Sequence, residues 1–214
     1  MKISYFGHSC FALESEGYRL IIDPYTRVQG YPELPKIPAN AVYASHGHFD
    51  HNYFDAVSLS APSRPTPFKV ETIASYHDER KGALRGENKI HVFKAEGMSA
   101  VHLGDLGHLP DKDTVDAAGK CDILMIPVGG CYTIDGDTAF RAAEFFAPRF
   151  ILPMHYRKDG RGFDEISEPE IFLKHYPKSS VKTFPKGAVT IEKGSLKEAE
   201  ASEEGLIPLI VVSL

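Results

Sequence analysis

Residues 46–51 read His46-Gly47-His48-Phe49-Asp50-His51, and this stretch is the strongest indication in the sequence of both fold and function. Three histidines and one aspartate follow directly on residues 41–45, whose composition is typical of a β-strand. Imidazoles and a carboxylate crowded together suit a borderline divalent ion such as zinc. Positions spaced i, i+2, i+4 and i+5 do not share one face of a helix, so we expect a loop at the end of a strand.

The chain has 214 residues, enough for one domain with a large hydrophobic core. Its composition, 43% hydrophobic and 25% charged residues, is that of a globular protein. The formal net charge of -5 gives no overall attraction to nucleic acid, so we expect a small-molecule substrate instead. Three cysteines without paired spacing, and a start that lacks a signal-peptide core, favour a cytoplasmic protein.

The order of expected elements predicts an α/β (α+β) fold. Short β-prone runs at 2–6, 10–14 and 19–22 are separated by glycines and indicate an antiparallel meander. Buried strands are expected at 123–128 and 150–153, because both runs are almost entirely apolar. The other expected strands are 70–76, 89–94, 99–103, 181–184 and 188–192, and the expected helices are 113–120, 137–146 and 168–174.

The pattern divides the chain into a domain at 1–194 and a C-terminal tail at 195–214. The tail begins with charged and small residues and continues with a strongly apolar run at 206–212. Seven apolar residues are too few to cross a bilayer, and no longer run occurs elsewhere, so no membrane partner is expected. We expect the tail to pack on its own domain or on a partner subunit, which leaves a homo-oligomer open.

Three further candidate ligands, His77, Asp105 and His155, lie where a β-rich run gives way to glycine or to a loop. Their placement argues against the alternative that 46–51 is only a polar loop rich in histidine. His77 is chosen by order and spacing, so His91 and His102 remain rivals for its position. Strand alternation favours Asp105 facing the site with His102 facing away.

Taken in order, these residues resemble the signature of the metallo-β-lactamase superfamily: His46, His48, Asp50 and His51, then His77, Asp105 and His155. The resemblance extends over roughly residues 1–192. Within the superfamily, the chain is similar to small single-domain hydrolases related to ascorbate-6-phosphate lactonase. The segments that carry this likeness are Gly7-His8-Ser9-Cys10-Phe11, His102-Leu103-Gly104-Asp105 and Pro153-Met154-His155-Tyr156.

The resemblance implies a four-layer αββα sandwich with two zinc ions, or manganese in their place, at one edge. It implies that His46, His48 and His77 bind the first ion, that Asp50, His51 and His155 bind the second, and that Asp105 bridges both. Asp50 and Asp105 would then also be the catalytic residues. A water shared by two such cations ionises near neutral pH and can attack a carbonyl or a phosphorus.

Other residues could complete the site. His8, His108 and Tyr132 are candidates for binding substrate or protonating the leaving group, although each could equally be a packed or solvated side chain. Asp23 could line the site or bond turn amides. Asp78 could orient the imidazole of His77 or serve as a turn aspartate. Several loop cations could bind an anionic substrate or could simply be solvated: Arg27, Arg80, Lys81, Arg85, Arg157, Lys158 and Arg161.

These observations predict a binuclear zinc hydrolase that acts on a small, anionic lactone, ester or phosphodiester. The expected walls of its cavity are the loops at 25–40, 60–67, 78–88 and 156–167, which are poor in the aromatic residues that single-stranded nucleic acid stacks on. One alternative is a nuclease or phosphodiesterase acting on nucleic acid. Another is a di-iron redox protein of the same fold, in which glutamate typically replaces the histidine found here at position 48.

Overall fold

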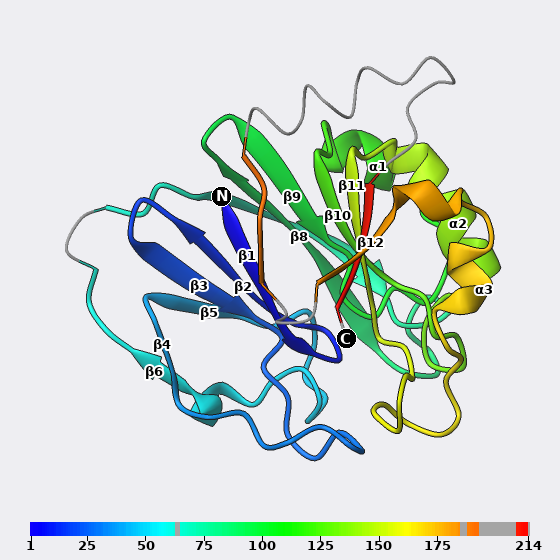
Figure 1. Ribbon diagram of the computed structural model, residues 1–214, viewed down its shortest axis with the longest axis horizontal. Coiled ribbons are helices and arrows are strands. Elements are labelled where there is room, and N and C mark those ends of the chain that lie inside the picture. The colour runs from blue at the N-terminus through cyan, green and yellow to red at the C-terminus, as the bar shows by residue number, and fades with distance from the viewer. Residues whose placement is uncertain (63–64, 185–187, 193–208, 214) are drawn as a thin grey trace.

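Two β-sheets packed face to face form the body of the protein (Figure 1). The computed structural model describes residues 1–62, 65–184, 188–192 and 209–213. Within these residues, the five-stranded sheet has the order β13-β1-β2-β3-β5. Its strands are β1 (Lys2–Gly7), β2 (Cys10–Ser15), β3 (Tyr18–Ile22), β5 (Ala41–Tyr43) and β13 (Ala188–Thr190). The expected antiparallel meander is confirmed, because β1 pairs with β2 and β2 with β3 in antiparallel register.

The second sheet of the described residues has seven strands in the order β12-β14-β11-β10-β9-β8-β7. Strands β7, β8 and β9 are antiparallel, whereas β9, β10, β11, β14 and β12 run parallel to one another. Their bounds are β7 (Lys69–Tyr76), β8 (Glu87–Ala95), β9 (Met98–His102), β10 (Ile123–Pro127), β11 (Phe150–Met154), β12 (Val181–Phe184) and β14 (Leu209–Ser213).

The space between the two sheets is filled by one apolar cluster. Phe11 and Leu13 of the five-stranded sheet share it with Phe93, Met125 and Leu152 of the other sheet. These side chains are almost completely buried, so the sheets are held together by the burial of apolar surface. The packing fixes the edges of the two sheets relative to each other, which is what the candidate site requires.

Helices cover the outer face of the seven-stranded sheet (Figure 1). They are α1 (Lys112–Ala118), α2 (Gly136–Phe146) and α3 (Glu170–Leu173), with a 3-10 turn η2 (Lys178–Ser180) before β12. The carboxylates of Asp111 and Asp135 cap α1 and α2 by accepting the backbone N–H of Thr114 and Thr138, each at 2.8 Å. The apolar face predicted for α2 is confirmed, since its members are buried: Ala139, Ala142, Ala143 and Phe146.

The outer face of the five-stranded sheet differs from the expected helical layer. In the described residues it is covered by the segment 24–36, by the short parallel pair β4 (Ile37–Ala39) and β6 (Val57–Leu59), and by the 3-10 turn η1 (Phe54–Ala56). Tyr25 and Val28 pack there against Cys10 and Ile21. The apolar residues of this loop segment therefore take the place of a covering helix.

Strand β14 lies inside the seven-stranded sheet, between β11 and β12, and is parallel to both. The tail was expected to pack on its own domain or on a partner subunit, and the described part at 209–213 is paired within this chain. The proposed domain boundary at 194 lies outside the described residues. No helix of the described residues is both long and apolar enough to cross a membrane.

A proline within β14 tests how much this pairing stabilises the fold. Val211 pairs with Lys182 of β12, and proline cannot donate the backbone hydrogen bond of a central strand. We expect Val211→Pro to lower the Tm by several degrees, since about 1 kcal/mol shifts the Tm of a chain this size by roughly 2–4 °C. Val211→Thr is the control, because threonine suits a strand. Equal melting temperatures for both variants would contradict the prediction.

Candidate metal centre

The predicted ligands follow the carboxyl ends of strands, and those from the seven-stranded sheet follow strands that run in one direction. Strand β5 leads into residues 46–51, β7 into His77, β9 into Asp105 and β11 into His155. The antiparallel pairs β7–β8 and β8–β9 give β7 and β9 the same direction, and β10 joins β9 and β11 in parallel. The ends of such strands meet at one edge, which is where α/β proteins place ligands.

The carboxylate of Asp105 lies at the centre of these residues. Its Oδ2 is 3.2 Å from Nε2 of His51, 3.2 Å from Nε2 of His77 and 3.2 Å from Nε2 of His155. Two ligands bound to one ion by bonds of about 2.0–2.1 Å, at near-tetrahedral angles, are themselves roughly 3.3 Å apart. The spacing therefore fits a carboxylate oxygen and imidazole nitrogens that share ions.

Electrostatics in this centre keep Asp105 ionised. Burial would raise the pKa of the Asp105 carboxyl, but His155 and His51 hold that pKa well below its usual range. Its Oδ1 is buried and makes no hydrogen bond within the described residues. A buried acceptor without a partner is costly unless something else binds it, so this oxygen also fits an ion.

Asp23 orients two of the imidazoles. Its Oδ2 accepts a hydrogen bond from Ser45 Oγ at 2.7 Å and another from Nδ1 of His51 at 2.9 Å. Ser45 Oγ in turn lies 2.9 Å from Nδ1 of His46. These contacts occupy the Nδ1 atoms, and Nε2 of both His46 and His51 is left without a hydrogen bond. Such a pattern orients imidazoles whose free nitrogens bind a metal.

The pKa values of His46 and Asp23 agree with this role, whereas that of His51 describes a ring to which Asp105 and Asp23 attract a proton, as they would attract a cation. Burial, together with the neighbouring His51, lowers the pKa of His46 to about 3, so this imidazole is neutral at pH 7, as a metal ligand must be. Burial would raise the pKa of Asp23, but the adjacent His51 lowers it to about 2, which keeps Asp23 ionised. Burial would lower the pKa of His51, but Asp105 and Asp23 raise it well above its usual value.

Three groups of side chains in the described residues bring their ligand atoms within 4.8 Å of one another. One group contains His46, His48 and His77, the set predicted for the first ion. Another contains His8 together with the set predicted for the second ion: Asp50, His51 and His155. The third contains Asp105 with His46 and His51, which belong to different predicted sets. The seven predicted ligands thus come together, while their binding of metal stays a prediction.

The two rivals of His77 lie elsewhere. His102 is fully buried, with its Nε2 3.1 Å from the carbonyl oxygen of Ser9 and its Nδ1 accepting the backbone N–H of Gly104 at 3.1 Å. The ring of His91 lies between Thr72 Oγ1 and the carbonyl oxygen of Ala44, each at 3.1 Å. Both imidazoles therefore have partners of their own, and neither belongs to the three groups.

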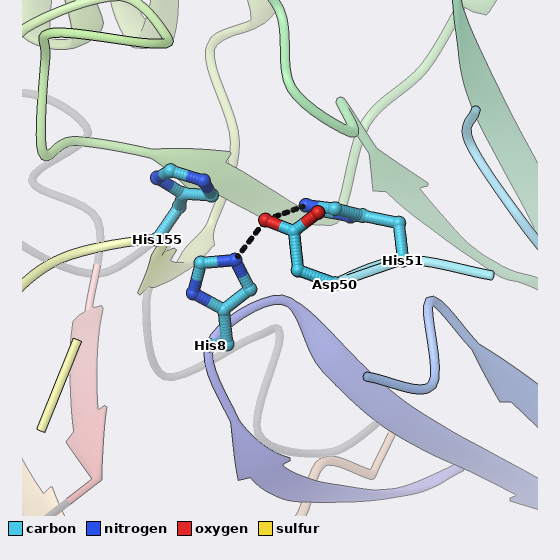
Figure 2. A group of neighbouring side chains, drawn as sticks. All are labelled: His8, Asp50, His51 and His155. Atoms are coloured by element: carbon cyan, nitrogen blue, oxygen red, sulfur yellow. Dashed lines mark hydrogen bonds and ion pairs between the residues drawn. The ribbon is translucent and has the colours of Figure 1, made fainter. Parts of the chain in front are cut away.

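The ring of His8 contacts the carboxylate of Asp50 (Figure 2). Its Nε2 is 3.2 Å from Asp50 Oδ2, and its ring centroid is 4.2 Å from that of His155. Burial lowers the pKa of His8 to about 4, so the neutral ring donates its N–H to the carboxylate. His8 is 0% exposed and does not line the cavity, so this candidate substrate-binding residue contacts Asp50 and His155 instead of the space that a substrate would occupy.

Of the other two candidates for substrate binding, His108 uses Nδ1 to contact the carbonyl oxygen of Leu109 at 3.0 Å and does not line the cavity. Tyr132 does line it. Asp78 has the turn role rather than the imidazole-orienting role. Its carboxylate accepts hydrogen bonds from four backbone N–H groups of its own loop, those of Arg80, Gly82, Leu84 and Arg85, at 2.8–3.1 Å.

A cavity of about 430 Å³ opens directly on this centre. Five predicted ligands reach it, and the remaining wall is formed by residues from four loops: Phe49, Leu84, Arg85, Tyr132 and Phe163. The expected contributions of loops 78–88 and 156–167 are confirmed. Neither 25–40 nor the described part of 60–67 lines this cavity, and three aromatic side chains do, contrary to the expectation of walls poor in aromatics.

Comparison with known proteins agrees with this geometry. The family model described as the beta-lactamase superfamily domain matches residues 2–155. The chain belongs to this superfamily. A metal-dependent hydrolase of Carboxydothermus hydrogenoformans is 26% identical over 194 residues, covering 73% of this chain and 84% of the relative. Another metal-dependent hydrolase, from Methanosarcina mazei, is 27% identical over 214 residues, covering 81% and 90% respectively.

Solved structures share the fold. A candidate Zn-dependent hydrolase of the metallo-β-lactamase superfamily from Thermotoga maritima has a TM-score of 0.72 and 27% identity, over 99% of this chain and 97% of that one. An isothiocyanate hydrolase from Delia radicum gut bacteria has a TM-score of 0.56 and 13% identity, over 99% and 96%. The predicted fold and the predicted class, a metal-dependent hydrolase of the metallo-β-lactamase superfamily, are confirmed.

Replacing Asp105 and His102 separately tests the geometry of strand β9. We expect Asp105→Ala to remove bound metal and nearly all turnover, because three imidazole nitrogens converge on its Oδ2. His102→Ala should retain bound metal and lose far less activity, since its ring faces Ser9. Metal content by mass spectrometry and turnover are measured on both variants. Comparable losses of metal would contradict the assignment.

Removing the ring of His8 tests its support of Asp50. We expect His8→Ala to weaken one of two bound ions by roughly 10- to 100-fold, as loss of a residue that orients a ligand does, and to spare the other. Calorimetric titration of zinc into metal-free protein measures both sites. His8→Gln, which retains a donor, should recover part of the affinity, and His108→Ala is the control. Equal weakening of both ions would show a general loss of packing.

Proposed function

We propose that this metal-dependent hydrolase holds two divalent ions, zinc or manganese, and hydrolyses a small, anionic lactone, ester or phosphodiester. The observation that carries the proposal is the position of Asp105 Oδ2, 3.2 Å from imidazole nitrogens of three separate segments. A carboxylate in this position can bridge two ions. The buried imidazole and carboxylate atoms without hydrogen bonds fit the same ions.

The chain's own residues would divide between two ions. His46, His48 and His77 would hold the first and leave it an open position, as a catalytic ion requires. The second ion would be held by Asp50, His51 and His155. Bound in this way, the ions would supply Lewis-acid activation of water and of the scissile bond.

Neighbouring side chains would orient the residues that bind the ions. Asp23 and Ser45 hold the rings of His46 and His51 by their Nδ1 atoms, and His8 holds the carboxylate of Asp50. Asp50 also lines the cavity, so its carboxylate is accessible from the space that a substrate would occupy. This carboxylate is thereby placed to position a reacting water and to carry a proton.

The cavity favours a small substrate over nucleic acid. Its volume of about 430 Å³ is within the range of small-molecule sites, and Arg85 is the one cationic side chain among its described lining residues. Nucleic acid is bound mainly through several phosphate contacts made by lysine and arginine. A di-iron redox activity is disfavoured by His48, which belongs to an all-histidine group.

Metal analysis tests the number and identity of the ions. Freshly purified protein should contain about two zinc or manganese ions per chain. Chelation should lower the Tm, because the ions bind the folded state and not the unfolded one. Finding a single ion per chain, or iron at both positions, would contradict the binuclear zinc or manganese site.

Turnover tests the substrate class. The metal-loaded protein is assayed side by side on a series of lactones, aryl esters, small phosphodiesters and structured RNA, with Asp105→Ala as the inactive control. We expect hydrolysis of at least one small anionic compound and none of RNA. Efficient cleavage of RNA with no action on small esters would favour the nuclease alternative.

A further inference from the structure

An aromatic wall runs along the cavity beside the candidate metal centre. The ring centroids of Phe49 and Phe163 are 6.5 Å apart, and those of Phe163 and Tyr132 are 6.1 Å apart. These three rings come from different loops, after β5, β11 and β10. Phe49 is 53% exposed and Leu84, which also lines the cavity, is 61% exposed. The wall therefore offers apolar surface to whatever enters.

The guanidinium of Arg85 lies next to Tyr132, one of the three rings of this wall. The Cζ atom of Arg85 is 5.8 Å from the centre of the Tyr132 ring, and Nη2 donates to the carbonyl oxygen of Cys131 at 3.0 Å. Among the described residues its partners are this carbonyl and this ring, with no carboxylate at ion-pair distance. A guanidinium has five N–H donors in a planar fork, so several remain for an anion.

Arg85 is held in place through its backbone. The carboxylate of Asp78 accepts the backbone N–H of Leu84 at 3.0 Å and that of Arg85 at 2.8 Å. Asp78 itself is buried and follows directly on His77, a predicted ligand. The loop that carries both lining residues is thus ordered before a ligand binds, which reduces the entropy cost of binding.

We propose that the cavity selects a substrate with an aromatic or alkyl group and a nearby carboxylate. The apolar group lies against the wall formed by Phe49, Phe163 and Tyr132 and against Leu84, and the carboxylate binds Arg85. One cationic side chain in the described lining matches a single negative charge. Arg85 is then a specificity-determining residue. The inference rests on the proposed function, because the scissile bond of this substrate must reach the same centre.

Ligand binding tests the inference without requiring turnover. The probes are 3-phenylpropionate, its neutral analogue 3-phenylpropan-1-ol and the ring-free acid propionate, titrated calorimetrically into metal-loaded protein. We expect 3-phenylpropionate to bind at least about tenfold more tightly than either partial probe, since a hydrogen-bonded charge and a buried ring each contribute on that order.

Two variants with matched controls assign the contributions. Arg85→Met should remove the preference for the acid over the alcohol, whereas Arg80→Met, on the same loop but outside the cavity lining, should leave it unchanged. Arg85→Lys should keep part of the preference. Leu84→Ser should reduce the preference for 3-phenylpropionate over propionate, while Leu59→Ser, equally exposed at 61% on β6, should not.

Several outcomes would overturn the inference. They are equal binding of the acid and the alcohol, an acid preference that survives Arg85→Met because the ions bind the carboxylate, and no binding of any probe. A change in the solution mass of the protein caused by Leu84→Ser would instead assign Leu84 to an interface between two copies of the chain. Failure of the proposed function is seen separately, as absence of ester and lactone hydrolysis by the wild-type protein.

Discussion

The burial of one carboxylate, that of Asp105, is the constraint on which the rest of the structure depends. This side chain is 1% exposed, and an ionised carboxylate without partners is very costly in a protein interior. Its Oδ2 is surrounded instead by imidazole nitrogens from the ends of β7 and β11 and from the loop after β5. Face-to-face packing of the two sheets brings the end of β5 to those of β7 and β11, so the position of the charged centre depends on the apolar cluster between the sheets.

Support for the centre comes from residues that do not face the cavity. Asp23 follows β3 and accepts hydrogen bonds from Ser45 and His51, which join the end of β3 to the loop after β5, its neighbour in the sheet. His8 follows β1 and contacts Asp50, 42 residues further along the chain. The five-stranded sheet therefore orients the predicted ligands through hydrogen bonds, and these bonds determine which imidazole nitrogens are left free to bind an ion.

The centre and the cavity wall are built differently. The predicted ligands lie at the ends of strands, whose backbone pairing and apolar core fix their positions. The wall residues are on loops, and the loop with Leu84 and Arg85 is organised around the carboxylate of Asp78. Substitutions in these loops can alter what enters the cavity without moving the ligands, which separates the chemistry of the centre from its selectivity.

The sequence by itself determined the histidine-rich loop at 46–51, the ends of the strands that carry the other candidates, the separation of His102 from the candidate ligands and the buried face of α2. These features depend on spacing along a few residues, and strand alternation and helical periodicity are local properties. Only the tertiary structure decided that His8 meets Asp50, that β14 lies between β11 and β12, and that aromatic rings from three loops lie along one cavity with Arg85. Each of these depends on which distant segments become neighbours when the sheets pack, and no local pattern of residues specifies that.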